Sequence, residues 1–534
     1  MGENNQILQE MIKELQKKLP DGRPIGITFS TEEKKYYYDT VTGKIITCDD
    51  LAYQIVEKIL DGKVNEIVQL SESENLIESI RNIINVIEHE KIFALSKFEK
   101  MVDFGEYEDL IQNQLEQLTL ELTEKCNLRC GYCIYNEACE KNRDFGDKDM
   151  DEETALKAID YAKTHSGKTD TLHIGYYGGE PLVNYPVMIK SMRYALETMK
   201  NRKLHFAFTT NAVLLTKDKC KELAEIPNLS VTVSLDGPEK WHDFYRRNMH
   251  GDGSFHQTLQ GIKNLVDAFG YDRAKENILF SMVYAPPYSE ERLEETQKFF
   301  EELKWLPSEC VKFITYPDEE SMDTIYKYLQ KNQLLEAAKW GNTELDFSLS
   351  DYSHKHEKQP GMFTEKLMTD SYLPIRKRAI FDVVMDSIRM NGCCVPGQRK
   401  LYVTVNGEFR ICERVGKIPT IGNIENGIDI DKVKKIYIDG YRNESMKKCS
   451  SCWYARICSI CYCGCYTGEK FDLGKKTEMC EERKASCLRS LKAYFEALEN
   501  DIHAMDHLDS ITVMLFGKLN AAVSIRLKRV FQST

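Results

Sequence analysis

The feature that most constrains this fold is an alternation of strand-like and helix-like segments between residues 118 and 316. Runs rich in β-branched and aromatic residues are separated by stretches with the apolar period of amphipathic helices, such as 151–165 and 184–200. Strands that are joined through helices pair in parallel. The pattern therefore predicts an α/β fold whose parallel sheet curves into a partial (β/α)6 TIM-type barrel over residues 115–335. The six strand-like runs are 118–122, 171–177, 203–208, 229–235, 278–284 and 311–316.

The length and charge of the chain exclude several classes of function. A formal net charge of −12 over 534 residues disfavours a nucleic-acid partner, because phosphate binding needs a basic surface. No apolar run reaches the roughly 18 residues of a membrane-spanning helix. The first residues contain no basic segment followed by an apolar core, so we expect no signal peptide and a cytoplasmic location. A chain of this length is expected to form three or four domains.

Eighteen cysteines are distributed unevenly along the chain. Four lie in 126–139 and eleven in 393–487, whereas Cys48, Cys220 and Cys310 stand apart. Cysteines in a reducing compartment stay as thiols. Isolated ones are therefore expected to be small buried apolar residues, and dense clusters are expected to bind metal.

The first cluster directly follows the first predicted strand, with Cys126, Cys130 and Cys133 in a C-x3-C-x2-C spacing. Three thiolates can hold three corners of a [4Fe–4S] cube and leave the fourth iron open for chemistry. The alternative is a structural zinc site, which would need a fourth ligand, and Cys139 is the local candidate. Ligands of barrel folds bind at the carboxyl ends of the strands, which is where this loop lies.

In this context the triad resembles that of the radical S-adenosylmethionine (SAM) enzymes. Tyr132, just before the third cysteine, matches the family, and so does the "GGEP" stretch after the second predicted strand. The resemblance spans roughly residues 115–335 and implies that the triad binds a [4Fe–4S] cluster that cleaves SAM. It also implies that GGEP binds the SAM amino group, because its glycines let backbone carbonyls approach an ammonium and Glu180 complements its charge.

Three further positions in the resemblance end the third and fourth strands or follow them. Asn211 in "TTNA" would serve the SAM ribose or carboxylate, and Arg246 would pair with the carboxylate. The alternative for each is a helix cap or a surface ion pair. The expected SAM-binding residues are Gly178, Gly179, Glu180, Asn211, Ser234 and Arg246.

The second cysteine cluster resembles the SPASM extension of radical SAM enzymes that modify peptides. Its pattern is C-x9–15-G-x4-C, a gap, C-x2-C-x5-C-x3-C, a further gap and a final cysteine. The chain departs from it at Tyr462, where a cysteine is expected between Cys461 and Cys463. Positions that fit without adjustment are Cys394, Gly407, Cys412, Cys449, Cys452 and Cys458.

The SPASM resemblance implies two auxiliary [4Fe–4S] clusters, and three clusters in the whole protein. One would be held by Cys449, Cys452, Cys458 and Cys480, with Cys487 as the alternative final ligand. The other would be held by Cys394, Cys412 and one of Cys461, Cys463 and Cys465, of which we favour Cys461. An open iron there would accept substrate sulfur or a neighbour such as Cys393. A pair of structural zinc knuckles is the alternative to these clusters.

Residues 1–105 read as a separate α+β unit. Three β-prone runs, 23–30, 34–40 and 43–49, precede helical patterns over 49–62 and 72–90. The unit resembles the winged-helix-like leader-peptide recognition element of enzymes that modify ribosomal peptides (RiPPs). An edge strand beside a helix offers backbone pairing to an extended leader, and the alternative is a packing domain without a ligand.

The remaining segments are expected to connect these units. Residues 106–117 are predicted to form a charged linker and residues 336–390 a helical bridge. The SPASM region is placed at 391–490 and a helical tail at 491–534.

These resemblances together imply a maturase that installs thioether crosslinks in a Cys-containing ribosomal precursor peptide. A 5′-deoxyadenosyl radical would abstract hydrogen from a peptide carbon, and a peptide cysteine would close the sulfur-to-carbon bond. The expected partners are the leader-bearing peptide and a flavodoxin- or ferredoxin-type reductant. The alternatives are a maturase that forms carbon–carbon crosslinks, a sulfatase-type maturase that forms formylglycine, and a zinc-stabilised peptide-binding scaffold.

Overall fold

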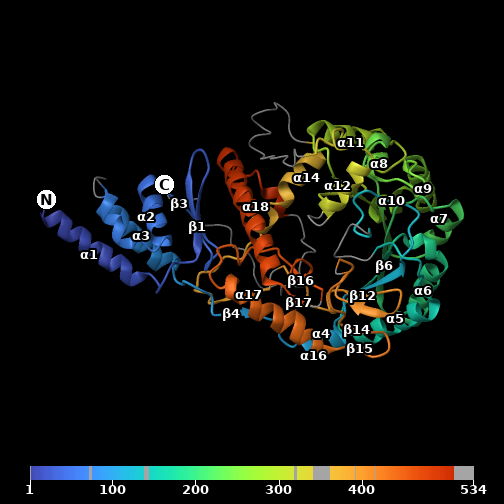
Figure 1. Cartoon of the computed structure of the whole chain (residues 1–534), viewed down its shortest axis with the longest axis horizontal. Coiled ribbons are helices and arrows are strands. Elements are labelled where there is room, and N and C mark those ends of the chain that lie inside the picture. Colours follow the sequence, from blue (N-terminus) through green and yellow to red (C-terminus); the bar gives the residue numbers. More distant parts are fainter. Residues whose placement is uncertain are drawn as a thin grey trace.

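The computed structural model describes residues 2–70, 75–136, 144–317, 321–340, 361–390, 392–414, 416–468 and 470–509. Figure 1 shows an N-terminal unit, in blue, at one end of the molecule and an α/β unit, mostly green, at the other. The long helix α18 (Leu473–Asn500) lies between them. The C-terminal part of the chain therefore sits against both other units.

All six predicted strands are present and lie side by side in chain order. Each pairs in parallel with its neighbour in the sequence. The predicted α/β fold is thus confirmed. The strands are β5 (Gln117–Thr123), β6 (Thr171–Gly178), β7 (Lys203–Thr210), β8 (Leu229–Ser234), β9 (Ile278–Val283) and β10 (Lys312–Thr315).

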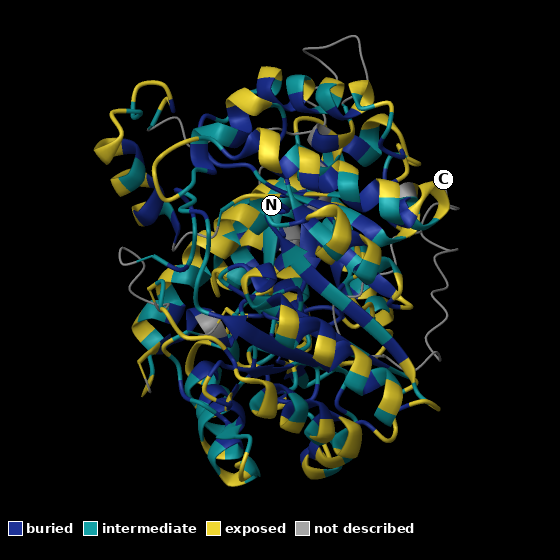
Figure 2. Cartoon of the chain, turned by 90° about the vertical axis from the view of Figure 1, so that its right-hand side faces the viewer, coloured by how far each residue is buried: buried dark blue, intermediate teal, exposed yellow. Residues whose placement is uncertain are grey.

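Helices cross over between these strands and bury one apolar face each. In α5 (Glu152–His165), Ala155, Ala158, Ile159 and Ala162 are fully buried, which is the i, i+3, i+4, i+7 stripe of an amphipathic helix. Figure 2 shows buried strands beneath helices whose outer faces are exposed. The other helices of this unit are η2 (Pro181–Asn184), α6 (Tyr185–Thr198), α7 (Lys217–Ala224), α8 (Glu239–Tyr245), α9 (Phe255–Phe269), α10 (Tyr271–Asn277), α11 (Glu290–Glu302), α12 (Met322–Lys331), α14 (Met362–Asp370) and α15 (Leu373–Arg376).

The sheet does not stop at β5. Strand β12 (Leu401–Val403) pairs with β5 in parallel, and β13 (Glu408–Arg410), β14 (Gly422–Asn423) and β15 (Gly427–Ile428) continue it, so that ten described strands form one sheet. Gly407 connects β12 to β13 with a φ of +77°. A side chain at that angle is strained, which explains the glycine of the cysteine–glycine–cysteine pattern.

The N-terminal unit contains α1 (Gly2–Lys18), three antiparallel strands, α2 (Asp50–Leu60), η1 (Val64–Leu70) and α3 (Leu76–Glu90). The strands β1 (Gly26–Ser30), β2 (Lys35–Asp39) and β3 (Ile45–Cys48) pair in the order β1-β2-β3. Successive side chains of β2 point to opposite faces. Tyr37 packs against the unit's own helices, whereas Tyr36 and Tyr38 pack against α18.

The predicted connections and boundaries differ from the structure in three places. Residues 106–117 were expected as a charged linker, but they contain helix α4 (Tyr107–Asn113), because Tyr107 and Ile111 bury one side of it. The end of the predicted helical bridge is not helical: β11 (Ser387–Arg389) pairs in parallel with β4 (Lys100–Val102). The predicted boundary at residue 490 falls inside the continuous helix α18.

Short elements complete the cysteine-rich region. They are α16 (Ile430–Val433), a π-helical turn η4 (Lys434–Gly440), α17 (Tyr441–Cys449), η5 (Tyr462–Gly464), β16 (Tyr466–Thr467) and β17 (Lys470–Phe471), and η6 (Asp506–Asp509) follows α18. Within the described ranges, no helix is both long and apolar enough to cross a bilayer.

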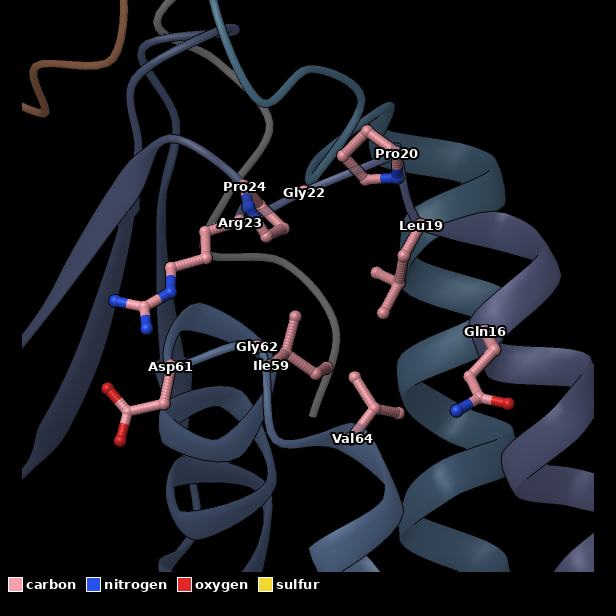
Figure 3. A pocket seen from close by; sticks show the side chains of 10 residues that line it. All are labelled: Gln16, Leu19, Pro20, Gly22, Arg23, Pro24, Ile59, Asp61, Gly62 and Val64. Carbon is pink, nitrogen blue, oxygen red and sulfur yellow. The ribbon is translucent and has the colours of Figure 1, made fainter.

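A hollow of about 400 Å³ lies in the N-terminal unit, between the end of α1 and the end of α2. Figure 3 shows Leu19, Ile59 and Val64 pointing into it. No cysteine lines this hollow, so it is separate from the thiols described next.

Candidate functional site

The cysteine triad lies in the loop that leaves the carboxyl end of β5. Cys126, Cys130 and Cys133 are all partly buried. Burial raises the pKa of the Cys126 thiol above its ordinary value, and the nearby Cys130, Glu180 and Cys133 raise it further. The three thiols therefore lie close enough to influence one another. Metal binding requires thiolates, so a bound cation would remove the cost that burial imposes on their charge.

The two glycines of "GGEP" let the end of β6 pack directly on this loop. The Gly179 N–H donates to the carbonyl of Thr123 at 2.8 Å, and the Glu180 N–H donates to the carbonyl of Lys125 at 2.9 Å. A Cβ at Gly178 would lie 2.3 Å from the Thr123 oxygen, and one at Gly179 would lie 2.1 Å from the Lys125 oxygen. The described contacts of these glycines are therefore with the protein backbone.

Glu180 is 2% exposed and holds neighbouring strand ends together. Its carboxylate accepts hydrogen bonds from the Leu182 N–H, the Thr210 hydroxyl and the Asn211 N–H at 3.1, 2.8 and 2.8 Å. Burial raises the pKa of Glu180, and these hydrogen bonds oppose that rise. The Asn211 side-chain amide in turn donates to the Asn127 side chain, inside the cysteine loop, at 2.8 Å.

Arg246 forms a buried ion pair that the sequence did not indicate. Its Nε lies 2.9 Å and its Nη2 3.3 Å from the two carboxylate oxygens of Asp236. Tyr132 donates a short hydrogen bond to the same carboxylate, and the Val283 N–H donates to it at 3.0 Å. Burial acts to raise the pKa of Asp236, but Arg246, His242 and Tyr132 together outweigh it and the net pKa is lowered.

The placement of Arg246 limits what it does. Much of its charge is neutralised by Asp236, and its Nη1 lies 4.0 Å from the sulfur of Cys130. Its described partners are therefore a carboxylate and a triad thiol, so its role as partner of the SAM carboxylate stays a prediction. The sequence analysis did not single out Asp236 as a site residue, although it lies in the same "SLDG" motif as Ser234.

The predicted SAM-site residues all lie at one edge of the sheet. The triad follows β5, the glycines end β6, Asn211 follows β7, and Ser234 is the last residue of β8. Parallel strands present their carboxyl ends at the same edge, which is why motifs far apart in the sequence meet there.

A second group of thiols surrounds the junction of α17 and α18. Cys449 ends α17, Cys480 lies on α18, and Cys452 and Cys458 lie on the segment between them. Burial raises the pKa of Cys452 to about 11 and that of Cys458 to about 12. Cys449 acts on the pKa of the other three thiols, so the four lie close together.

The remaining cysteines of this region are placed differently from one another. Cys393 is buried and lies close to Cys465 and Cys458, whereas Cys394 is exposed and Cys412 and Cys461 are partly buried. The Cys465 thiol donates to the carbonyl of Cys461 at 3.3 Å. Cys487 lies near Cys458, whereas Cys480 lies near Cys449 and Lys476. Cys139 and the Cys463 side chain lie outside the described residues.

Neither group of described thiols has the geometry of a site for a single metal ion. In the described part of the chain, no three His, Cys, Asp or Glu side chains converge as ligands of one metal ion. Each cysteine thiolate of a [4Fe–4S] site binds a different iron atom. The cysteine sulfurs of such a site therefore surround the whole cluster and do not converge on one metal position. In the triad and in the group around Cys449, the thiols are partly buried and lie close enough to raise one another's pKa.

Comparison with protein families agrees with this geometry. Residues 120–300 match the model of the radical SAM superfamily. The chain carries a radical SAM domain. The expected radical SAM domain is thereby confirmed, and such a domain implies one [4Fe–4S] cluster and SAM as cofactors.

Sequence similarity to individual proteins covers less than half of this chain. The chain is 34% identical over 149 residues to a serine-type anaerobic sulfatase-maturating enzyme of Bacteroides thetaiotaomicron, covering 28% of this chain and 35% of that protein. It is 24% identical over 256 residues to the radical SAM cyclopropyl synthase TigE of Paramaledivibacter caminithermalis, covering 44% and 52%. The chain spans about half or less of the length of these curated relatives. A structure of anSMEcpe with bound AdoMet matches 74% of this chain and 99% of its own at 17% identity, with a TM-score of 0.48.

We predict that Gly179→Ala disturbs the triad, because its methyl group would collide with the backbone of the cysteine loop at Lys125. The expected cost is about 1–3 kcal/mol of stability, together with lower iron content at the triad. Gly167→Ala is the matched control, since a Cβ there meets nothing within 4 Å. Thermal unfolding and iron analysis after anaerobic reconstitution measure both effects. Equal iron content in the two variants would contradict this role of Gly179.

Proposed function

We propose that the protein is a radical SAM maturase that installs thioether crosslinks in a Cys-containing ribosomal precursor peptide. The observation that carries the proposal is the N-terminal unit: one face of its sheet packs on α18, the helix that bears Cys480, while β3 keeps an open edge. A peptide held at that edge would be tethered to the part of the molecule that contains both groups of thiols.

The radical SAM domain supplies the reactive site of this proposal. Cys126, Cys130 and Cys133 would hold the SAM-cleaving cluster, and the chain around Gly179, Asn211 and Ser234 would bind SAM. When bound, the triad cluster would supply the electron that splits SAM into methionine and a 5′-deoxyadenosyl radical, and the auxiliary clusters would accept the electron left when the thioether closes. The Asp236–Arg246 pair and Glu180 keep the strand ends fixed and exclude water from this edge.

The cysteine-rich region would hold the two auxiliary clusters. Cys449, Cys452, Cys458 and Cys480 form the first ligand set, which their mutual closeness supports. The second set would be Cys394, Cys412 and one of Cys461, Cys463 and Cys465. The exposure of Cys394 supports a second site that a substrate thiol reaches from solvent. A flavodoxin- or ferredoxin-type reductant in the cytoplasm would supply the electrons.

The open edge of β3 fits an extended leader peptide. The Asp39 N–H donates to the carbonyl of Lys44 at 2.9 Å, so these two residues form a hydrogen-bonded pair. From that pair on, bonded and non-bonded pairs alternate along the antiparallel ladder of β2 and β3. Ile46 and Cys48 therefore bond to β2, while Ile45 and Thr47 direct their N–H and C=O groups outward. No described strand pairs with that side of β3. These groups would pair with a leader by β-augmentation.

A sulfatase-type maturase that forms formylglycine is the second candidate. The 34% identity over 149 residues to the Bacteroides sulfatase-maturating enzyme favours it. That similarity covers only 28% of this chain. The separate N-terminal unit supports the ribosomal-peptide substrate instead.

Replacing Cys126, Cys130 and Cys133 by alanine together is expected to abolish reductive SAM cleavage, because no thiolate then holds the SAM-binding cluster. Iron and sulfide at the auxiliary sites should remain. Chromatography of 5′-deoxyadenosine after dithionite reduction measures the first effect, and metal analysis measures the second. Continued 5′-deoxyadenosine formation in the triple variant would disprove the assignment of the triad.

We predict that Thr47→Pro weakens binding of the precursor peptide, because it removes an outward N–H of β3 without breaking a bond to β2. The loss of one hydrogen bond is worth about 0.5–1.5 kcal/mol, or roughly two- to tenfold in Kd. Fluorescence polarisation of the labelled peptide encoded beside the gene measures this change.

The matched control for that variant is Thr28→Pro. The Thr31 N–H donates to the Lys34 carbonyl, and bonded and non-bonded pairs alternate along β1 from that pair. Thr28 is therefore in a non-bonded pair with Tyr37, and its N–H and C=O groups point outward at the other edge of the sheet. SAM cleavage should be unchanged in both variants. Equal weakening by the two prolines would mean that the leader does not dock at β3.

The product itself tests the reaction type. Each thioether removes two hydrogens from the peptide and protects one thiol from iodoacetamide, and mass spectrometry of the co-expressed peptide records both. A two-hydrogen loss with every thiol still alkylatable would exclude the thioether. Reaction of that product with a hydrazide would then identify formylglycine, and its absence would favour a carbon–carbon crosslink.

A further inference from the structure

Lys476 is a buried ammonium group in the cysteine-rich region. It lies in the first turn of α18 and is 2% exposed. Its Nζ donates to the Ser445 hydroxyl at 2.7 Å and to the Tyr441 hydroxyl at 3.2 Å, and lies 3.5 Å from the sulfur of Cys449. These contacts include no carboxylate of any described residue. A buried cation without an anionic partner is costly, so its charge requires an explanation.

The three groups that the Lys476 Nζ contacts lie on one face of α17. Tyr441, Ser445 and Cys449 follow each other at intervals of four residues, which places them in one row along the helix. The Lys476 Nζ also lies 4.4 Å from the centre of the Tyr441 ring. The ammonium is therefore held in a fixed position, with one donor directed at the sulfur that ends the row.

No described carboxylate forms an ion pair with Lys476, and the charged groups that act on it most strongly are the surrounding thiols in their ionised form. Cys465, Cys458 and Cys480 act on it electrostatically in addition to Cys449. Three of these four belong to the ligand set proposed for the first auxiliary cluster. An iron–sulfur cluster with thiolate ligands is anionic, and hydrogen bonds to its sulfurs help to set its reduction potential.

We propose that Lys476 is a positioning residue for the auxiliary cluster on Cys449, Cys452, Cys458 and Cys480, and that it raises the reduction potential of this cluster. One-electron reduction adds one negative charge to the site, and the ammonium beside Cys449 stabilises the reduced form over the oxidised form. The inference rests on the proposed function, because it requires the cluster to be present. A raised reduction potential would make this cluster a better electron acceptor.

The test uses the full-length, anaerobically reconstituted protein with Cys126, Cys130 and Cys133 replaced by alanine, so that only auxiliary clusters contribute signals. Lys476→Met should lower the potential of one cluster in a redox titration followed by electron paramagnetic resonance. We expect at least a tenfold fall in the equilibrium constant for reduction, which is 59 mV for a one-electron couple. Lys476→Arg keeps the charge and should shift the potential less.

Lys492→Met is the matched control, since Lys492 is an exposed lysine on the same helix. Its potentials should equal those of the parent protein. An unchanged potential in Lys476→Met, with the cluster assembled, would overturn the inference and leave the proposed function intact. If the parent protein, which lacks the triad cysteines, contained no iron or sulfide, the auxiliary-cluster assignment would fail, and the inference with it.

A second measurement decides the question even if Lys476→Met does not assemble the cluster. In protein labelled with 15N at the lysine side chains, the cluster spin should show a hyperfine coupling to one nitrogen. The coupling should disappear in Lys476→Arg, which removes the labelled atom and keeps the cation. A parent protein without the coupling, or a coupling unchanged in Lys476→Arg, would show that Lys476 does not contact the cluster.

Discussion

Strand β5 is the element on which the rest of the molecule depends. Leu118, Leu120 and Leu122 are fully buried, and nearly the whole strand is covered on both faces, as expected at the centre of a parallel sheet. It pairs with β6 on one side and with β12 on the other. Its carboxyl end leads into the cysteine triad. One strand therefore anchors the triad, the "GGEP" stretch and the hairpin of the cysteine-rich region.

Both cysteine regions share one physical arrangement: a buried cation lies beside a partly buried thiol. Arg246 lies next to Cys130 and is held by Asp236, whereas Lys476 lies next to Cys449 and is held by hydroxyl groups. The different partners have different consequences. Arg246 is largely neutralised by a carboxylate, so its net effect on the triad is reduced, whereas Lys476 has no ion pair with a described carboxylate and lies among thiols.

The N-terminal unit is joined to the rest by apolar packing and a few polar contacts. Phe29 and Tyr36 stack with ring centroids 5.1 Å apart, and Phe495 of α18 lies 4.6 Å from Tyr36. The Thr31 hydroxyl also donates to Glu499 at 2.9 Å. This packing covers one face of the sheet but not the β3 edge. The arrangement places the open edge of β3, the proposed docking site for a peptide, in the same unit that packs on the helix bearing Cys480.

The sequence by itself determined the elements whose cause is local. Periods of two and 3.6 residues predict the six barrel strands, and cysteine spacing predicts the triad, because those signals lie within a few neighbouring residues. Tertiary structure decided the rest. The pairing of β12 with β5, the strand pair β4–β11 and the ion pair of Asp236 with Arg246 join residues that are distant in the sequence or lie on separate elements. Their partners are chosen by burial and charge in the folded chain, which no local pattern records.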